Sequence, residues 1–181
     1  MFIETQETPN PHTMKFIPGV QVLSAGIKSF SGDNDLKESP LAASLFQIDG
    51  VKGVFLTTDF ITVTKSVDHD WSYLKPIVLA AIVDHLVAGL PICIEGAAAN
   101  EDATTHGDIA KQVIELIETR VRPAVAQDGG DIIFKDFQNG IVYVELHGSC
   151  SGCPSSTITL KSGIENMLKH YIPEIISVEA V

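Results

Sequence analysis

The fold of the second half of the chain is decided by the stretch Ile132-Ile-Phe-Lys-Asp-Phe-Gln-Asn-Gly-Ile-Val-Tyr-Val-Glu-Leu146. Its two arms, residues 132–137 and 141–146, have the alternating character of strands. Asn139-Gly140 lies between them, and this pair favours the type I′ turn because both central residues of that turn need positive φ angles. The stretch therefore predicts an antiparallel hairpin.

Helical patterns flank this hairpin on both sides. Apolar residues keep helical spacing after Asp108 and again after Pro154. Pro123 is expected to kink or end the first of these helices because proline has no backbone N–H. A last strand is expected at residues 176–181. The order predicts an α+β domain of the pattern α-β-β-α-β, with the helices on one face of a three-stranded sheet.

The first half of the chain predicts a second small domain of strands and helices. Ser39-Pro40 offers a capping hydroxyl and a proline at the first helical position, so a short helix is expected to begin there. The other elements expected in this half are strands near residues 2–5 and 14–17, a hairpin of residues 53–58 and 60–65, and a helix over residues 71–88.

Residues 95–107 separate the two halves. This segment has no large apolar side chain and therefore nothing to bury in a core. The sequence thus predicts a domain at residues 1–94, a linker at 95–107 and a second domain at 108–181.

The charge of the chain excludes some classes of partner. It has 181 residues, with Lys+Arg 12 against Asp+Glu 23 and a formal net charge of −11. Nucleic acids and anionic membranes need a dense basic face, so neither is expected as a partner. The longest apolar run, residues 77–83, is far shorter than the roughly 20 residues of a membrane span.

The number of cysteines indicates the compartment. Three cysteines cannot all pair within one chain, and the first residues resemble neither a secretory signal nor an organellar presequence. We expect a soluble protein of a reducing compartment, either the cytoplasm of a bacterium or, for a mature eukaryotic form, the mitochondrial matrix.

The strongest chemical motif is Cys150-Ser-Gly-Cys153, in the loop between a strand and a helix. The two-residue spacing lets both sulfurs converge on one point. Unpaired N–H groups at the start of the helix are expected to stabilise the thiolates and so to lower both cysteine pKa values.

Several kinds of site remain open for this motif. A closed zinc site needs four ligands and the motif supplies two. A thioredoxin-like dithiol pair requires a strand order that a tight Asn-Gly hairpin fits poorly. Two chains together would supply the four thiolates of a 4Fe-4S or 2Fe-2S cluster at a symmetric interface. A purely structural pair of buried cysteines is disfavoured because a glycine-rich surface loop has little core for them to join.

The motif also belongs to longer stretches that resemble known proteins. Val121-Arg-Pro-Ala-Val-Ala-Gln-Asp-Gly-Gly-Asp131, with Leu146-His-Gly-Ser-Cys-Ser-Gly-Cys-Pro-Ser-Ser156 and Thr159-Leu-Lys161, is similar to the C-terminal domain of NifU-type scaffold proteins. Residues 7–19, 45–51, 59–65 and 71–76 resemble the N-terminal domain of the Nfu-type iron-sulfur carriers.

This resemblance implies a carrier and not an enzyme. In such a protein, Cys150 and Cys153 bind a 4Fe-4S cluster shared between two subunits, with a 2Fe-2S cluster as the alternative. The homodimer receives its cluster from upstream assembly machinery and transfers it to apo iron-sulfur proteins. The N-terminal domain binds no cluster in the family. The competing hypotheses for the function are a thioredoxin-like dithiol oxidoreductase and a zinc-binding interaction module.

Other residues with chemical potential have plainer explanations. Cys93 is flanked by apolar residues and is interpreted as a small core side chain. Asp128 and Asp131 surround Gly129-Gly130 and are expected to shape a turn. The basic residues that could steer an anionic cluster, but are usually only solvated on a surface, are Arg120, Arg122, Lys135 and Lys161.

Overall fold

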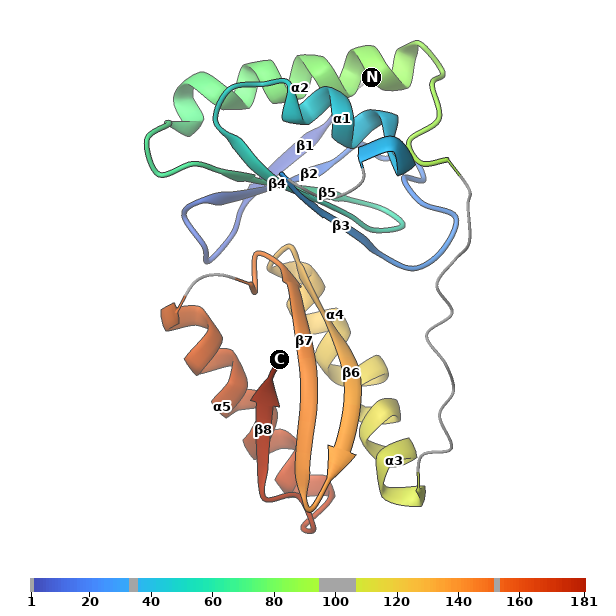
Figure 1. Cartoon of the computed structure of the whole chain (residues 1–181), viewed down its shortest axis with the longest axis vertical. Helices are drawn as coiled ribbons and strands as arrows, with labels where there is room; N and C mark the ends of the chain where they lie inside the picture. Colours follow the sequence, from blue (N-terminus) through green and yellow to red (C-terminus); the bar gives the residue numbers. More distant parts are fainter. Residues whose placement is uncertain (1, 33–35, 95–106, 152–153) are drawn as a thin grey trace. The chain divides into compact units, whose positions relative to one another are not determined.

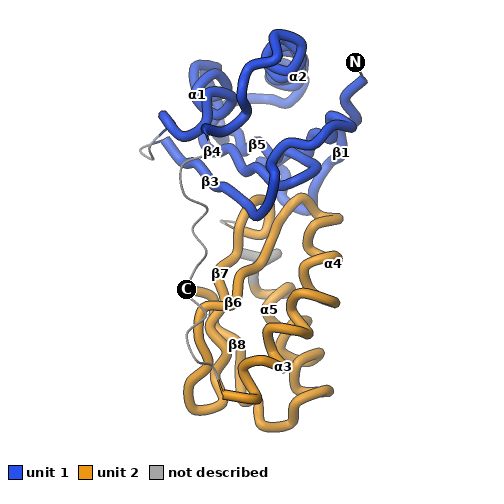
Figure 2. The backbone as a smooth tube through the Cα atoms, turned by 90° about the vertical axis from the view of Figure 1, so that its right-hand side faces the viewer, with its two compact units in different colours: residues 1–99 blue, residues 100–181 orange. Residues whose placement is uncertain are grey.

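The computed structural model describes residues 2–32, 36–94, 107–151 and 154–181. The chain divides into two compact units, residues 1–99 (unit 1) and 100–181 (unit 2), as Figure 2 shows. The boundary falls inside the segment expected to be a linker. Apart from Gly107, that segment lies outside the described residues.

Unit 1 is an antiparallel sheet with two α-helices on one face (Figure 1). Its strand order is β1-β2-β5-β4-β3. Its core contains buried side chains from the sheet and from both helices, among them Phe16, Leu45 and Ile82. The elements are β1 (Glu4–Glu7), β2 (Thr13–Ile17), β3 (Lys28–Ser31), the 3-10 helix η1 (Leu36–Glu38), α1 (Pro40–Phe46), β4 (Val51–Leu56), β5 (Ile61–Lys65) and α2 (Trp71–Val87).

Helix α1 begins as its sequence predicts. The Ser39 hydroxyl accepts a hydrogen bond from the backbone N–H of Ala42 at 3.1 Å, and Pro40 occupies the first turn. The same hydroxyl donates to the carbonyl oxygen of Ile92 at 2.6 Å. Ser39 therefore caps the helix and also ties it to the segment that follows α2.

Unit 2 has the predicted order of helix, hairpin, helix and strand. Strands β6 and β7 are antiparallel, while β7 and β8 are parallel. The turn between β6 and β7 has φ angles of 52° at Asn139 and 80° at Gly140, which confirms the predicted hairpin. The elements are α3 (Asp108–Leu116), the π-helical segment η2 (Ile117–Val121), α4 (Arg122–Gln127), β6 (Gly130–Gln138), β7 (Ile141–Gly148), α5 (Pro154–Tyr171) and β8 (Ser177–Ala180).

The helix that precedes the hairpin does not end at Pro123. It passes through the π-helical segment η2 and continues as α4. The backbone N–H of Arg122 bonds to the carbonyl oxygen of Ile117, five residues back. Proline disturbs the usual ladder because it donates no hydrogen bond. Of the two predicted outcomes, a kink or an end, the helix therefore does not end but is interrupted by a π-helical turn, a rare feature that occurs mostly as a single turn inside α-helices.

The helices of unit 2 lie on one face of its sheet, as Figures 1 and 2 show. The fold class of the chain is α+β, as predicted. Buried residues from both layers form one core, including Ile132, Val144 and Val178 from the sheet and Val113 and Leu168 from the helices. Cys150 belongs to this core. None of the described helices has the length and apolar character needed to cross a membrane.

Candidate metal centre

The loop after β7 is held to the turn before β6 by backbone contacts. Gly148 ends β7 with a φ of 65°, in the left-handed region that favours glycine. Ser149 is buried, its N–H donates to the carbonyl oxygen of Gly129 at 3.3 Å, and its hydroxyl donates to the carbonyl oxygen of Asp128. Ser149, the residue before Cys150, is therefore held to this turn by both its backbone and its side chain.

Cys150 lies at the edge of the core and not on an open surface. It is 6% exposed and belongs to the same apolar cluster as Val121 and Val125. Burial raises the pKa of its thiol to about 11, with Asp128 and Asp131 adding in the same direction and a hydrogen bond with Ser149 opposing them. The predicted lowering of the cysteine pKa is therefore wrong for Cys150.

The second cysteine of the motif, Cys153, lies outside the described residues. Of the two candidate ligands, the structure thus places Cys150 alone. Within the described ranges no group of three or more His, Cys, Asp or Glu side chains is placed to hold a metal ion.

Gly130 makes room for Cys150. The two lie side by side because Gly130 at the start of β6 pairs with Gly148 at the end of β7. A methyl group added at Gly130 would overlap Cys150 Sγ and lie 2.9 Å from the carbonyl oxygen of His147. Any larger residue at position 130 would therefore push the sulfur aside. The sequence alone predicts only a turn at Gly130.

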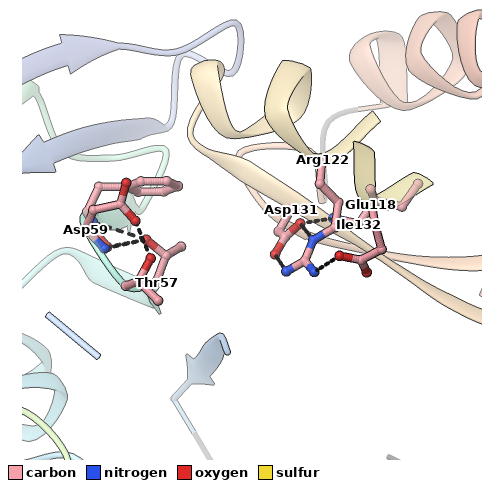
Figure 3. Close-up of polar contacts among 8 residues, drawn as sticks. Thr57, Asp59, Glu118, Arg122, Asp131 and Ile132 are labelled. Carbon is pink, nitrogen blue, oxygen red and sulfur yellow. Dashed lines mark hydrogen bonds and ion pairs between the residues drawn. The ribbon is translucent and has the colours of Figure 1, made fainter. Parts of the chain in front are cut away.

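An ion pair fixes the strand that carries Gly130 (Figure 3). Arg122 donates from Nε and Nη2 to the two carboxylate oxygens of Asp131 at 2.9 and 2.8 Å. Asp131 is 5% exposed, and its Oδ1 also accepts from the N–H of Ile132 at 2.7 Å. Arg122 makes a further contact with Glu118 at 2.7 Å. The hydrogen bond with Asp131, and secondarily the one with Glu118, raises the pKa of Arg122 above its ordinary value.

These contacts change the interpretation of the basic residues. Arg122 is a structural partner of the turn next to Cys150 and is not merely solvated. Lys135 and Lys161 form ion pairs with Glu145 and Glu179 at 2.7 and 2.8 Å. Arg120 lies over the ring of Tyr171, with its guanidinium carbon 5.2 Å from the centroid of the ring.

Cys93 belongs to unit 1 and packs against its core. Its side chain is half-buried beside residues of that core. Burial raises the pKa of the Cys93 thiol, while a hydrogen bond with Ser39 opposes the shift. The prediction that Cys93 is a packing residue agrees with this placement.

The chemistry of the loop suits a soft metal. A thiolate is a preferred ligand of iron-sulfur clusters and of zinc, and the absence of a side chain at Gly130 leaves space for the sulfur atom of Cys150.

The chain matches two families along its length. Residues 113–179 match the NifU-like domain, and residues 3–89 match the scaffold protein Nfu/NifU N-terminal domain. The human protein named NFU1 iron-sulfur cluster scaffold homolog, mitochondrial, is 50% identical over 183 residues, covering 100% of this chain and 72% of the relative. Its namesake from Drosophila ananassae is 48% identical over 184 residues, covering 100% and 64%.

Among solved structures, a NifU-like protein from Saccharomyces cerevisiae aligns with a TM-score of 0.48 and 24% identity, over 53% of this chain and 87% of the other. The chain spans about two thirds of the length of the curated relatives, from 72% for the human protein to 64% for the fly protein. Both domain matches and the identity over the whole chain point the same way, and the chain belongs to the Nfu family of iron-sulfur cluster scaffold proteins.

Proposed function

We propose that two copies of this chain hold one 4Fe-4S cluster between them through Cys150 and Cys153, and transfer it to apo-proteins. The family supplies the general role of an iron-sulfur cluster scaffold. The observation that supports the site is the position of Cys150, in a loop fixed by Gly130 and Ser149. One chain offers two cysteines at this loop, and a cluster with four thiolate ligands therefore needs a second chain.

The burial of Cys150 favours metal binding over dithiol chemistry. A thiol that exchanges disulfides must be accessible and substantially ionised at neutral pH. Cys150 is 6% exposed, and its pKa is raised. A metal instead displaces the proton when it binds. Release to a recipient then proceeds by exchange of one thiolate ligand for another, without a general acid or base.

The partners of the proposed carrier follow from its cargo. The donor is upstream iron-sulfur assembly machinery, and the recipients are apo-proteins whose own cysteines replace Cys150 and Cys153. The names of the relatives support the mitochondrial alternative for its location. We propose in addition that residues 1–94 and 108–181 act as separate domains joined by residues 95–107.

Anaerobic reconstitution with iron and sulfide tests this function. The wild-type chain should gain sulfur-to-iron charge-transfer absorption, four irons per two chains and the mass of a dimer. Mössbauer spectroscopy then separates 4Fe-4S from 2Fe-2S. The variant with Cys150→Ser and Cys153→Ser should gain none of these signals, while the control Cys93→Ser should behave as wild type.

Two other outcomes would replace the proposal. Zinc found in protein purified without air, with no cluster formed on reconstitution, would indicate a zinc-stabilised interaction module. Reduction of insulin disulfides that depends on both cysteines, without bound iron, would indicate an oxidoreductase.

A further inference from the structure

Ser149 connects the loop that carries Cys150 (the cysteine loop) to the end of helix α4. Its N–H donates to the carbonyl oxygen of Gly129, and its hydroxyl donates to that of Asp128. The last carbonyl groups of an α-helix have no partner inside the helix. Asp128 and Gly129 directly follow α4, so a single residue from the far end of the hairpin supplies donors to two carbonyl groups there.

The same hydroxyl also forms a hydrogen bond with Cys150. Ser149 is 3% exposed and Cys150 is 6% exposed, so water competes little for either side chain. Burial and two nearby carboxylates raise the pKa of Cys150, whereas the hydrogen bond with Ser149 lowers it. Of these influences, the contact with Ser149 is the one that favours a negatively charged sulfur.

The hydroxyl of Ser149 has one hydrogen atom to donate and two acceptors for it. With a neutral thiol at Cys150, the S–H group donates to Oγ of Ser149, and the hydroxyl hydrogen stays on the carbonyl oxygen of Asp128. A cysteine sulfur that binds iron is a thiolate and has no hydrogen to donate. It is then the stronger of the two acceptors, because hydrogen bonds to charged groups are stronger than those to neutral groups.

We propose that Ser149 is a positioning residue for Cys150, and that its hydroxyl turns from Asp128 to the Cys150 sulfur when a cluster binds and turns back when the cluster leaves. This inference rests on the proposed function. In the empty chain the hydroxyl holds the cysteine loop to the end of α4. In the loaded chain it stabilises the thiolate on iron, since hydrogen bonds to the ligand sulfurs tune iron-sulfur sites.

The change of acceptor accompanies the transfer of the cluster. The bond from iron to Cys150 breaks as iron binds a thiolate of the recipient, and Cys150 takes up the proton that the recipient thiol has released. No electron is transferred in this step. The protonated sulfur no longer competes for the hydroxyl of Ser149, which returns to the carbonyl oxygen of Asp128. The empty loop is thereby held to α4 again.

Ser151 offers a matched control on the other side of Cys150. Its hydroxyl also donates to a backbone carbonyl oxygen, that of Gly148 at 2.9 Å, and Ser151 itself is exposed. This bond lies within the turn that ends β7. Ser149→Ala and Ser151→Ala therefore each remove one hydroxyl from the same loop, but the first removes the bonds to Asp128 and Cys150 and the second removes a bond within the turn.

Hydrogen exchange measured by NMR tests the empty state in the reduced, metal-free chain. After correction for intrinsic rates, Ser149→Ala should speed exchange of the N–H at position 149 roughly fivefold, the factor expected for one net hydrogen bond. Ser151→Ala should leave this rate unchanged. Equal exchange in the wild-type chain and Ser149→Ala would overturn the holding contact with Asp128. Circular dichroism during thermal unfolding checks that both variants fold.

Resonance Raman spectroscopy tests the loaded state. The iron–thiolate stretching bands of the wild-type cluster should shift between H₂O and D₂O, because the hydrogen that Ser149 donates to the sulfur exchanges with solvent. The shift should be smaller in Ser149→Ala and unchanged in Ser151→Ala. Ser149→Ala should also lose iron to a ferrous chelator roughly tenfold faster, as for other groups that hydrogen-bond a metal ligand. A wild-type cluster without any isotope shift, or equal iron loss from the two variants, would contradict the turn of the hydroxyl toward Cys150.

The two measurements separate this inference from the proposed function. A wild-type chain that forms no cluster would refute the proposed function and with it the loaded state of Ser149, whereas hydrogen exchange would still report on the contact with Asp128. If the wild-type chain forms a cluster and both serine variants behave like it, the proposed function stands and the inference fails.

Discussion

The segments around Cys93 and Cys150 bury a cysteine in two different ways. In both places burial is the main cause that raises the pKa of the thiol. Cys93 packs beside the core of unit 1, in a segment tied down by the bond from the Ser39 hydroxyl to Ile92. Cys150 lies against Gly130, where an added methyl group would overlap its sulfur atom. Both cysteines are thus buried, and the difference that the structure shows between them is the close contact of the Cys150 sulfur with the backbone at Gly130.

The largest expected effect comes from filling the space beside Cys150. Gly130→Val places methyl groups where Cys150 Sγ lies, so the loop must shift or the strand must bend. We expect loss of cluster formation together with a destabilisation of about 1–3 kcal/mol, as for overpacked cores. Iron content after reconstitution and urea unfolding measure the two effects.

Gly163→Ala is the matched control for this substitution. Gly163 lies in α5, and an added methyl group meets nothing within 4 Å. Alanine there should raise stability by about 0.5–1 kcal/mol because glycine is unfavourable inside a helix. If Gly130→Val reconstitutes as well as Gly163→Ala, the contact between Gly130 and Cys150 has no role in the site.

The next effect concerns the ion pair beside the loop. Arg122→Leu leaves the buried carboxylate of Asp131 without its bidentate partner, and we expect a loss of about 2 kcal/mol because Arg122 itself is partly exposed. Glu118→Gln removes only the exposed contact of Arg122 and should cost about 0.3–0.5 kcal/mol. Urea unfolding at pH 7 compares the variants, and equal losses would contradict a special role for Asp131.

A smaller effect is expected at the other cysteine. Cys93→Ala removes one half-buried sulfur from the edge of the core of unit 1. We expect a loss of about 1 kcal/mol or less, with the cluster spectrum and the iron content unchanged. A weakened spectrum in this variant would remove the distinction between the two cysteines.

The smallest effect lies on the face of the sheet of unit 2 opposite its core. The hydrogen bond from Lys135, and secondarily the charge of His147, lower the pKa of Glu145. A lowered folded-state pKa stabilises the fold above the unfolded value of about 4.3, and this stabilisation is lost as the pH falls through the folded value.

Glu145→Gln should therefore cost a few tenths of a kcal/mol at pH 7, discounted for exposure, and almost nothing near pH 3. Urea unfolding at both pH values measures the difference. A cost that persists unchanged at low pH would show that packing, and not the ion pair, is what Glu145 contributes.

The features that the sequence predicts well are those set by local chemistry. Asn139-Gly140 required positive φ angles, and the structure has them. Ser39 and Pro40 start α1, as their side chains dictate. The hairpin of β4 and β5 and the helix α2 are also present at the predicted places. In each case a few neighbouring residues carry the information.

The features that the sequence could not predict depend on contacts between distant residues. Strand β3 contains a single apolar residue, Phe30, and exists because it pairs with β4. The role of Gly130 appears only when β6 is placed beside the loop after β7. The pKa of Cys150 follows from burial by helices that the local motif does not reveal. The start of a helix is a local feature that favours a lower pKa, whereas the core that buries Cys150 is formed by residues distant in the sequence.

The parallel pairing of β7 with β8 has a consequence for the order of folding. Parallel neighbours require a crossover, and here the crossover contains both the cysteine loop and α5. The pairing of Ile141 with Ser177 joins residues far apart in the chain, and contacts of this kind form slowly. We expect the hairpin to form early and β8 to dock late. Cys150 lies inside this crossover, whereas Gly130 and the helix α4 lie outside it, so Cys150 gains its buried position only when the crossover packs against β6 and α4.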